Sequence, residues 1–282
     1  MISDHYYSVE KVTAHIDAIR SRTGEIMYLI KGEDKALLID TCLGVGNLRQ
    51  LTDSLTDLPL TVWITHGHVD HALGAPAFID KEVYMNPADK EIYLLHSPLP
   101  VRQDYIEHNL RAELGSWAEA EYIPPTAPDF FKDLHDNDSM DLGGIHAEAY
   151  ALPGHTPGTM VVLIPEEKIL ITGDAANNAT FVFDEFTSPI ETYRENLITV
   201  SRRLEGKYDR CFMMHHQMEA SGDLLTNLIQ VCDEILKGTD DHVPARIMNR
   251  DVCIAKAASP HFQRHDGKDG NIVYRKDHLK AE

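Results

Sequence analysis

Three histidines and an aspartate fall within six residues, in the stretch His66-Gly67-His68-Val69-Asp70-His71. The stretch directly follows an apolar run at residues 60–65, which predicts a buried strand. Imidazole and carboxylate are side chains that bind divalent cations such as Zn²⁺. A lone histidine in a polar loop usually hydrogen-bonds to backbone. Three histidines with an aspartate at a strand end indicate a metal site instead.

The spacing of this motif predicts that its side chains divide between two ions. On extended backbone, residues at i and i+2 point the same way, so His66 and His68 can bind one ion. Asp70 and His71 come after the chain has begun to turn, with Gly67 easing the bend. They therefore point elsewhere, and we expect them to hold a second ion beside the first.

Three later segments place further candidate ligands at strand ends. His155 is bracketed by glycine and proline between two strand-like runs, and Asp174 leaves a strand-like run with no basic neighbour. His215 and His216 follow an apolar run at residues 210–214. Each of these residues alone is weak evidence for a ligand. Together with the first motif they supply the ligands that it lacks.

The order of the predicted elements favours an α/β protein, because strand-like runs alternate with amphipathic stretches over short links. Leucines at helical spacing predict a helix that Pro59 ends. The predicted strands are 26–30, 36–39, 60–65, 145–151, 160–164 and 168–172, the predicted helices are 48–58, 188–204 and 221–236, and 177–184 is expected to be a loop.

One further region separates the two strand-rich halves, and another follows the second half. Residues from about 88 to 130 are predicted to be a helical insertion, with a helix over 101–114, and this insertion is either packing decoration or a cover over a substrate. The tail carries one strand-like run, at 271–274. We predict a catalytic domain over residues 1–238 and a C-terminal extension over 239–282, packed on the same domain or on a neighbouring subunit.

Charge and composition limit the partners of the chain. It carries 45 acidic and 26 basic residues, for a net charge of −19. Nucleic-acid affinity comes largely from Lys and Arg that neutralise phosphates, so we expect no nucleic-acid partner. No apolar run approaches the roughly 20 residues that cross a bilayer, and no secretory signal is recognisable, so we expect no membrane partner. Four scattered cysteines favour reduced thiols and a cytoplasmic location.

These motifs together resemble the metallo-β-lactamase superfamily of metallohydrolases. Its signature His-x-His-x-Asp-His stands here at residues 66–71, and its later ligands match His155, Asp174 and a histidine after residues 211–214. Asp40, in Leu-Ile-Asp-Thr, matches a family landmark next to the metals. The resemblance covers about residues 10–238. It implies a four-layer αβ/βα sandwich of two mixed β-sheets flanked by helices, with the metals at one sheet edge.

The resemblance also implies a dinuclear centre and assigns its ligands. The implied set is His66, His68 and His155 on the first metal, Asp70, His71 and a late histidine on the second, and Asp174 bridging both. We favour His215 over His216 as the late ligand, because the family histidine sits directly at the strand end and adjacent strand residues point to opposite faces. We expect two divalent metal ions, with zinc favoured and iron or manganese as alternatives.

The expected activity is hydrolysis by metal-activated hydroxide, with Asp70 as a catalytic proton carrier at the leaving group. The bond would be ester-like (a thioester, lactone or related bond) in a small-molecule metabolite. Asp70 and Asp174 make the chain similar to glyoxalase II and the lactonases, although the basic substrate clamp of glyoxalase II is not recognisable. Three alternatives stay open: an iron-containing redox or oxygen-binding protein, a phosphodiesterase, and a metal-stabilised binding protein. A homo-oligomer is compatible with each of these functions.

Overall fold

The computed structural model describes residues 6–109 and 122–281. The chain divides into two compact units, Met1–Ala147 and Glu148–Glu282, and the division falls inside the strand β9 (His146–Ala151). The predicted boundary of the catalytic domain at residue 238 stays a prediction.

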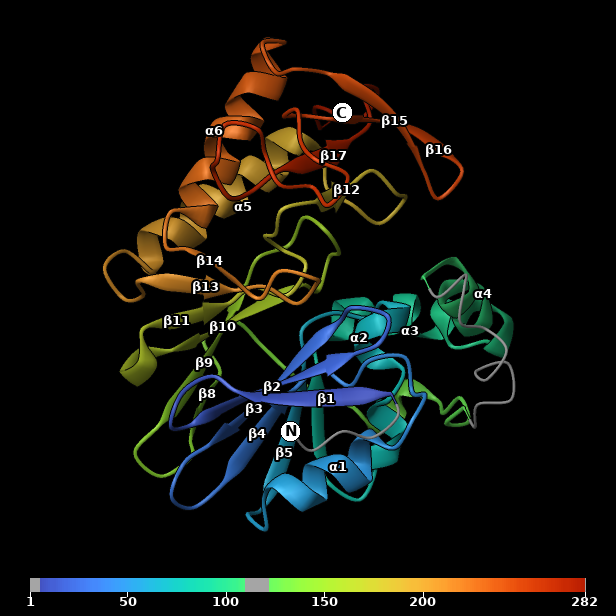
Figure 1. Ribbon diagram of the computed structural model, residues 1–282, viewed down its shortest axis with the longest axis vertical. Coiled ribbons are helices and arrows are strands. Elements are labelled where there is room, and N and C mark those ends of the chain that lie inside the picture. Colours follow the sequence, from blue (N-terminus) through green and yellow to red (C-terminus); the bar gives the residue numbers. More distant parts are fainter. Residues whose placement is uncertain (1–5, 110–121, 282) are drawn as a thin grey trace. The chain divides into compact units, whose positions relative to one another are not determined.

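The first unit is built on a seven-stranded mixed sheet, drawn mainly in blue in Figure 1. Strands β1 to β4 pair antiparallel, and strands β4 to β7 pair parallel. The predicted strands 26–30 and 36–39 are confirmed, and they pair as a hairpin with Leu29 opposite Leu38. The strands are β1 (Tyr7–Lys11), β2 (Ile16–Ser21), β3 (Ile26–Lys31), β4 (Ala36–Ile39), β5 (Leu60–Ile64), β6 (Glu82–Met85) and β7 (Lys132–Asp133).

The helix α1 (Leu48–Leu55) packs its apolar stripe against this sheet. Asn47 caps the helix by accepting a hydrogen bond from the backbone N–H of Gln50. Leu48 and Leu51 are buried in the same apolar cluster as alternate residues of β3, β4 and β5. The predicted helix is therefore confirmed, but it ends at Leu55 and not at Pro59.

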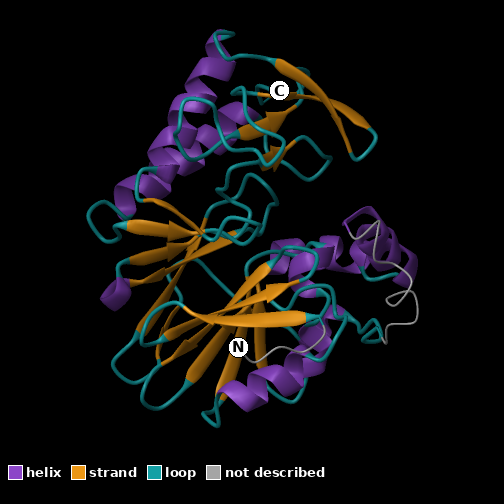
Figure 2. Ribbon diagram, in the orientation of Figure 1, coloured by secondary structure: helices purple, strands orange, loops and turns teal. Residues whose placement is uncertain are grey.

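Short helices follow β5 and β6, as Figure 2 shows in purple. They are α2 (Val69–Ala72), η1 (Ala75–Phe78), η2 (Pro87–Asp89), α3 (Lys90–His96), α4 (Leu99–Asn109) and η4 (Pro128–Phe130). The helix predicted over 101–114 begins two residues earlier, and its part from residue 110 onward lies outside the described residues. Arg102 and Ile106 form the buried side of α4.

The second sheet has the order β14-β13-β11-β10-β9-β8 and is also mixed. The predicted strands 160–164 and 168–172 are confirmed as β10 and β11, which pair as a hairpin with Leu163 opposite Leu170. β11 pairs parallel with β13. The further strands are β8 (Ser139–Asp141), β10 (Met160–Ile164), β11 (Ile169–Ile171), β13 (Arg210–Phe212) and β14 (Glu219–Ser221), with η5 (Pro165–Glu167) between β10 and β11.

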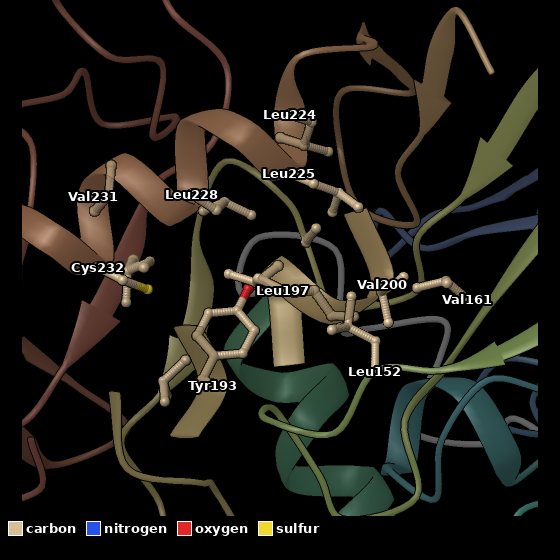
Figure 3. Close-up of a cluster of buried hydrophobic side chains, with 14 of the residues drawn as sticks. Leu152, Val161, Tyr193, Leu197, Val200, Leu224, Leu225, Leu228, Val231 and Cys232 are labelled. Carbon is tan, nitrogen blue, oxygen red and sulfur yellow. Dashed lines mark hydrogen bonds between the residues drawn. The ribbon is translucent and has the colours of Figure 1, made fainter. Parts of the chain in front are cut away.

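Two long helices, α5 (Ile190–Arg203) and α6 (Leu224–Lys237), lie side by side in the second unit (Figure 1). Figure 3 shows Tyr193 and Leu197 of α5 and Leu228 of α6 in one buried apolar cluster. Gly238 ends α6 in the left-handed conformation, with φ of 68°, where glycine carries no steric penalty. Both predicted helices are confirmed.

A third sheet, of order β12-β17-β16-β15, corrects two predictions. The expected loop at 177–184 contains β12 (Thr180–Val182), which pairs parallel with β17 (Ile272–Tyr274). The tail also holds the hairpin of β15 (Val243–Ile247) and β16 (Arg250–Ile254), which was not predicted. β12 spans only three residues, β15 contains a proline, and β16 begins with two charged residues, so no local pattern identified them as strands. Pairing with β17, far along the chain, holds β12 in its sheet.

The predicted fold class is confirmed: mixed sheets are flanked by helices. Within the part of the chain that the structure describes, no helix is both long and apolar enough to cross a membrane.

Candidate metal centre

The first histidine motif leaves the carboxyl end of β5, as predicted. His66 and His68 lie in the link after the strand, and Asp70 and His71 lie in α2. All four side chains are buried or nearly so. The short helix begins where the backbone N–H of Ala72 donates to the carbonyl of His68.

This turn brings His71 closer to His66 than the sequence predicted. The ring centroids of His66 and His68 are 4.8 Å apart, and those of His66 and His71 are 4.1 Å apart. Asp70 Oδ2 lies 3.7 Å from His71 Nε2. His71 therefore does not point away from His66, because the turn of α2 returns it to the same side.

Asp40, at the carboxyl end of β4, connects two of these histidines. Its Oδ1 accepts the backbone N–H of Thr65 at 2.7 Å, and its Oδ2 accepts the Thr65 hydroxyl at 2.7 Å. The Nδ1 atom of His71 lies 2.6 Å from the same Oδ2. The Nδ1 atom of His66 lies 3.0 Å from the Thr65 hydroxyl oxygen.

These contacts assign the tautomers of both rings. An ionised carboxylate only accepts hydrogen bonds, so His71 donates from Nδ1 to Asp40. The Thr65 hydroxyl donates to Asp40 and therefore accepts from Nδ1 of His66. In both rings Nε2 is then the nitrogen that would bind a metal, which is the arrangement that carboxylates and hydroxyls behind ligating histidines produce. Asp40 adopts a φ of 63°, in the left-handed region that aspartate enters more readily than most residues.

Glycine is required between the first two histidines. The backbone N–H of Gly67 donates to Oδ2 of the buried Asp89 at 2.8 Å. A Cβ atom at Gly67 would lie 2.6 Å from the carbonyl oxygen of Asp89. Asp89 thus holds the histidine loop, a role that its position in the sequence did not indicate.

Asp70 has a further neighbour that the sequence did not indicate. The hydroxyl of Tyr105, on α4, lies 2.8 Å from Asp70 Oδ2. Burial, together with the carboxylates of Asp70 and Glu25, raises the pKa of Tyr105 well above its usual range. The phenol therefore keeps its proton and acts as a hydrogen-bond donor.

The second unit holds the other three predicted ligands. His155 lies in the link between β9 and β10, and its Nδ1 is 2.8 Å from the carbonyl oxygen of Phe181 on β12. This contact makes Nδ1 the donor and Nε2 the nitrogen that would bind a metal. The Nε2 atom lies 3.6 Å from Oδ2 of Asp174.

Asp174 lies between two imidazoles of this unit. The same Oδ2 is 3.3 Å from Nε2 of His215, and the Asn177 amide is 3.4 Å from Oδ1. One carboxylate oxygen next to two ring nitrogens suits an aspartate that shares a metal site with both histidines. The bridging role itself stays a prediction.

The structure distinguishes the two adjacent histidines by position. β13 ends at Phe212, so both histidines lie beyond the strand and the alternation argument does not apply to them. His215 directs Nε2 toward Asp174, and its side chain is 19% exposed. His216 is exposed and adopts a φ of 51°. Its ring centroid lies 6.2 Å from that of His215. The choice of His215 as a ligand stays a prediction.

All seven predicted ligands lie in the described residues, four in the first unit and three in the second. The chain contains groups of histidine and aspartate that could hold a metal ion. Imidazole nitrogens and carboxylate oxygens fit a divalent ion of borderline character. The oriented Nδ1 atoms of three of the histidines support this fit.

Curated relatives match the chain over about half its length. An uncharacterized protein of Mycobacterium tuberculosis is 29% identical over 149 residues, which cover 49% of this chain and 61% of that protein. The acyl-coenzyme A thioesterase MBLAC2 of Gallus gallus is 25% identical over 167 residues, which cover 55% of this chain and 59% of that protein. The matches therefore span about three-fifths of the length of these relatives.

Solved structures share the fold at low sequence identity. A metallo-beta-lactamase from Pontibacter korlensis has a TM-score of 0.57 and 17% identity, covering 80% of this chain and 99% of that chain. An archaeal metallo-beta-lactamase superfamily protein from Sulfolobus tokodaii has a TM-score of 0.52 and 20% identity, covering 79% of this chain and 84% of that chain.

The model of the metallo-beta-lactamase superfamily matches residues 26–215. This range begins at β3 and ends at His215, so it includes the seven predicted ligands and Asp40. The chain belongs to the metallo-beta-lactamase superfamily.

Proposed function

We propose that this chain is a metal-dependent hydrolase in which the ligands of the two units bind a pair of divalent ions, with zinc favoured. The observation that carries the proposal is the hydrogen-bond chain from His66 and His71 to Asp40, which leaves the lone pair of Nε2 in both rings available to a metal. Hydrogen-bond partners behind both rings are typical of histidines that bind a metal. The family match supports joining this set to the ligands of the second unit.

The proposed assignment keeps the ligands predicted above. The first ion takes His66, His68 and His155, the second takes Asp70, His71 and His215, and Asp174 bridges them. Bound divalent ions supply activation of water and polarisation of a carbonyl or phosphoryl oxygen.

The protein's own groups orient these ligands and carry the proton. Asp40 holds His71, and through Thr65 it holds His66. Asp70 presents Oδ2 to the Tyr105 hydroxyl at 2.8 Å, so this carboxylate is already part of a hydrogen-bonded chain. We propose that Asp70 also delivers a proton to the leaving group, since a positioned carboxyl group can act as a general acid.

We propose a thioester of a small metabolite as the first substrate class to test. The support is the 25% identity to a relative named as an acyl-coenzyme A thioesterase. Lactones and phosphodiesters should be tested beside the thioesters, because a two-metal centre can polarise a carbonyl oxygen or a phosphoryl oxygen.

The test is turnover of acyl thioesters, lactones and phosphodiesters by the purified, metal-replete full chain. We expect thioester hydrolysis that a chelator abolishes and added Zn²⁺ restores. Faster turnover of another substrate class would replace the thioester as the proposed substrate, and the proposal of a hydrolase would stand. Visible absorption and redox activity from bound iron, with no hydrolysis, would overturn the proposal in favour of a redox protein.

We also propose a cytoplasmic location, a small-molecule substrate, no nucleic-acid or membrane partner, and a possible homo-oligomer. The support is the net charge of −19 and the four buried thiols outside disulfides. Cell fractionation and light scattering test the location and the oligomeric state.

A further inference from the structure

The helix α4 places one polar side chain next to a proposed metal ligand. Tyr105 follows the buried Arg102 by three positions, so the two side chains share one side of the helix. The Tyr105 hydroxyl lies 2.8 Å from Oδ2 of Asp70 and 2.8 Å from Oε1 of Glu25. Two carboxylate oxygens of the first unit therefore converge on a single phenol, whose one hydroxyl hydrogen they share.

Glu25 provides a fixed end for this contact. It directly precedes β3, and its side chain is buried. Its other oxygen, Oε2, accepts short hydrogen bonds from the hydroxyls of Ser21 and Thr23 and lies 3.5 Å from the Cys42 thiol. Donors on several sides hold this carboxylate in one orientation.

Arg102 fixes the helix that carries Tyr105. Its guanidinium donates to the backbone carbonyls of Ile123 at 2.7 Å, Ser97 at 3.4 Å and Leu43 at 3.5 Å. The side chain is fully buried, so these bonds replace the water that a charged group needs. The folded chain therefore holds α4, and with it the backbone of Tyr105, in place before a metal binds.

We propose that Tyr105, braced by Glu25, is a positioning residue that holds the Asp70 carboxylate in the orientation needed for the second metal. The inference rests on the proposed function, in which Asp70 is a ligand of that metal. Hydrogen-bond partners behind ligating carboxylates orient them, and their removal typically lowers metal affinity about 10- to 100-fold. The helical insertion then has a role beyond packing, because α4 delivers the group that orients a ligand.

The test is Tyr105→Phe, which removes the hydroxyl and keeps the ring. The metal-depleted full chain is titrated with Zn²⁺ in competition with a chromogenic chelator, which yields two dissociation constants. We expect the second dissociation constant to rise at least about 10-fold while the first stays within about twofold of wild type. A purely structural role would move both constants together.

The matched control is Tyr84→Phe. Tyr84 lies in the same unit, and its hydroxyl donates to the carboxylate of Glu82 at 3.2 Å, so the substitution removes the same kind of bond at an exposed site. We expect both dissociation constants to stay at wild-type values. A second-site effect equal to that of Tyr105→Phe would overturn the inference.

A double-mutant cycle tests the part played by Glu25. If Glu25 acts through Tyr105, Glu25→Ala should weaken the second site in wild type and add nothing in the Tyr105→Phe background. Additive effects would overturn the bracing role, and unchanged constants in Tyr105→Phe would overturn the whole inference. If wild type itself binds fewer than two ions, the proposed function fails, and that result is distinct from a failure of Tyr105 alone.

Discussion

Replacing Asp40 with Asn tests the hydrogen-bond chain behind the first histidine motif. Asp40 accepts three bonds, from the Thr65 backbone N–H, the Thr65 hydroxyl and His71 Nδ1. Asparagine has nearly the same shape and tolerates the φ of 63° found here, so the substitution changes chemistry and little else.

The amide has two orientations, and each of them fails. With its oxygen toward His71, its NH₂ faces the backbone N–H of Thr65, which can only donate and is left buried without an acceptor. With its NH₂ toward His71, the ring must move its hydrogen to Nε2, the nitrogen needed for a metal. An unmade buried bond costs about 1–3 kcal/mol, and loss of the charged acceptor adds to this, so we expect unfolding free energy to fall by about 2–5 kcal/mol.

Urea unfolding of the metal-free protein measures this loss of stability. Asp40→Asn should also weaken Zn²⁺ affinity by roughly 10- to 100-fold, because a group that orients a ligand is lost, and Zn²⁺ titration measures this change. Asp80→Asn is the control. Asp80 pairs with Arg49, but its side chain is 55% exposed, so stability should change by less than about 0.5 kcal/mol. If Asp40→Asn matched this control in both measurements, the orienting role of Asp40 would be refuted.

Three further predictions concern other residues. Asp174→Ala should remove the bridging ligand, so metal analysis should find one ion per chain and the hydrolysis rate should fall at least about 10-fold; retention of both ions at wild-type affinity would contradict the bridge. His215→Ala should lower occupancy of the second site, whereas His216→Ala, at an exposed position, should leave occupancy intact, and the reverse result would make His216 the ligand. Burial raises the pKa of Tyr193 well above its usual range, so this residue's contribution to stability is present at neutral pH and is lost as pH rises beyond about 10, where the unfolded chain ionises first. Tyr193→Phe should therefore lose less unfolding free energy than wild type between about pH 10 and pH 12, and equal losses would count against this reasoning.

Much of the fold was predictable because the informative signals are local. The hairpin of β3 and β4 has continuous apolar runs, and the helix α6 has an apolar period that spans the whole element. The motif at residues 66–71 was predictable as a metal site because several ligand types follow one buried strand. The strand β15 contains a proline and β16 begins with two charged residues, so the sequence alone did not indicate them.

The residues that orient the ligands were not predictable, apart from Asp40, which the family resemblance indicated. Tyr105 lies 35 residues from Asp70 and 80 residues from Glu25 along the chain, and no spacing rule joins them. The proximity of His66 and His71 depends on the course of the turn at α2, which the spacing of the motif did not specify. Such contacts form only when the chain is folded, so they are absent from any local pattern.

The most direct test of the proposed centre is the number of metal ions per folded chain. Elemental analysis of the purified protein, after equilibration with excess Zn²⁺ and removal of unbound metal, should give two equivalents per chain, because the proposed ligands exceed what one tetrahedral ion can bind. A reproducible single equivalent under these metal-replete conditions would contradict the account.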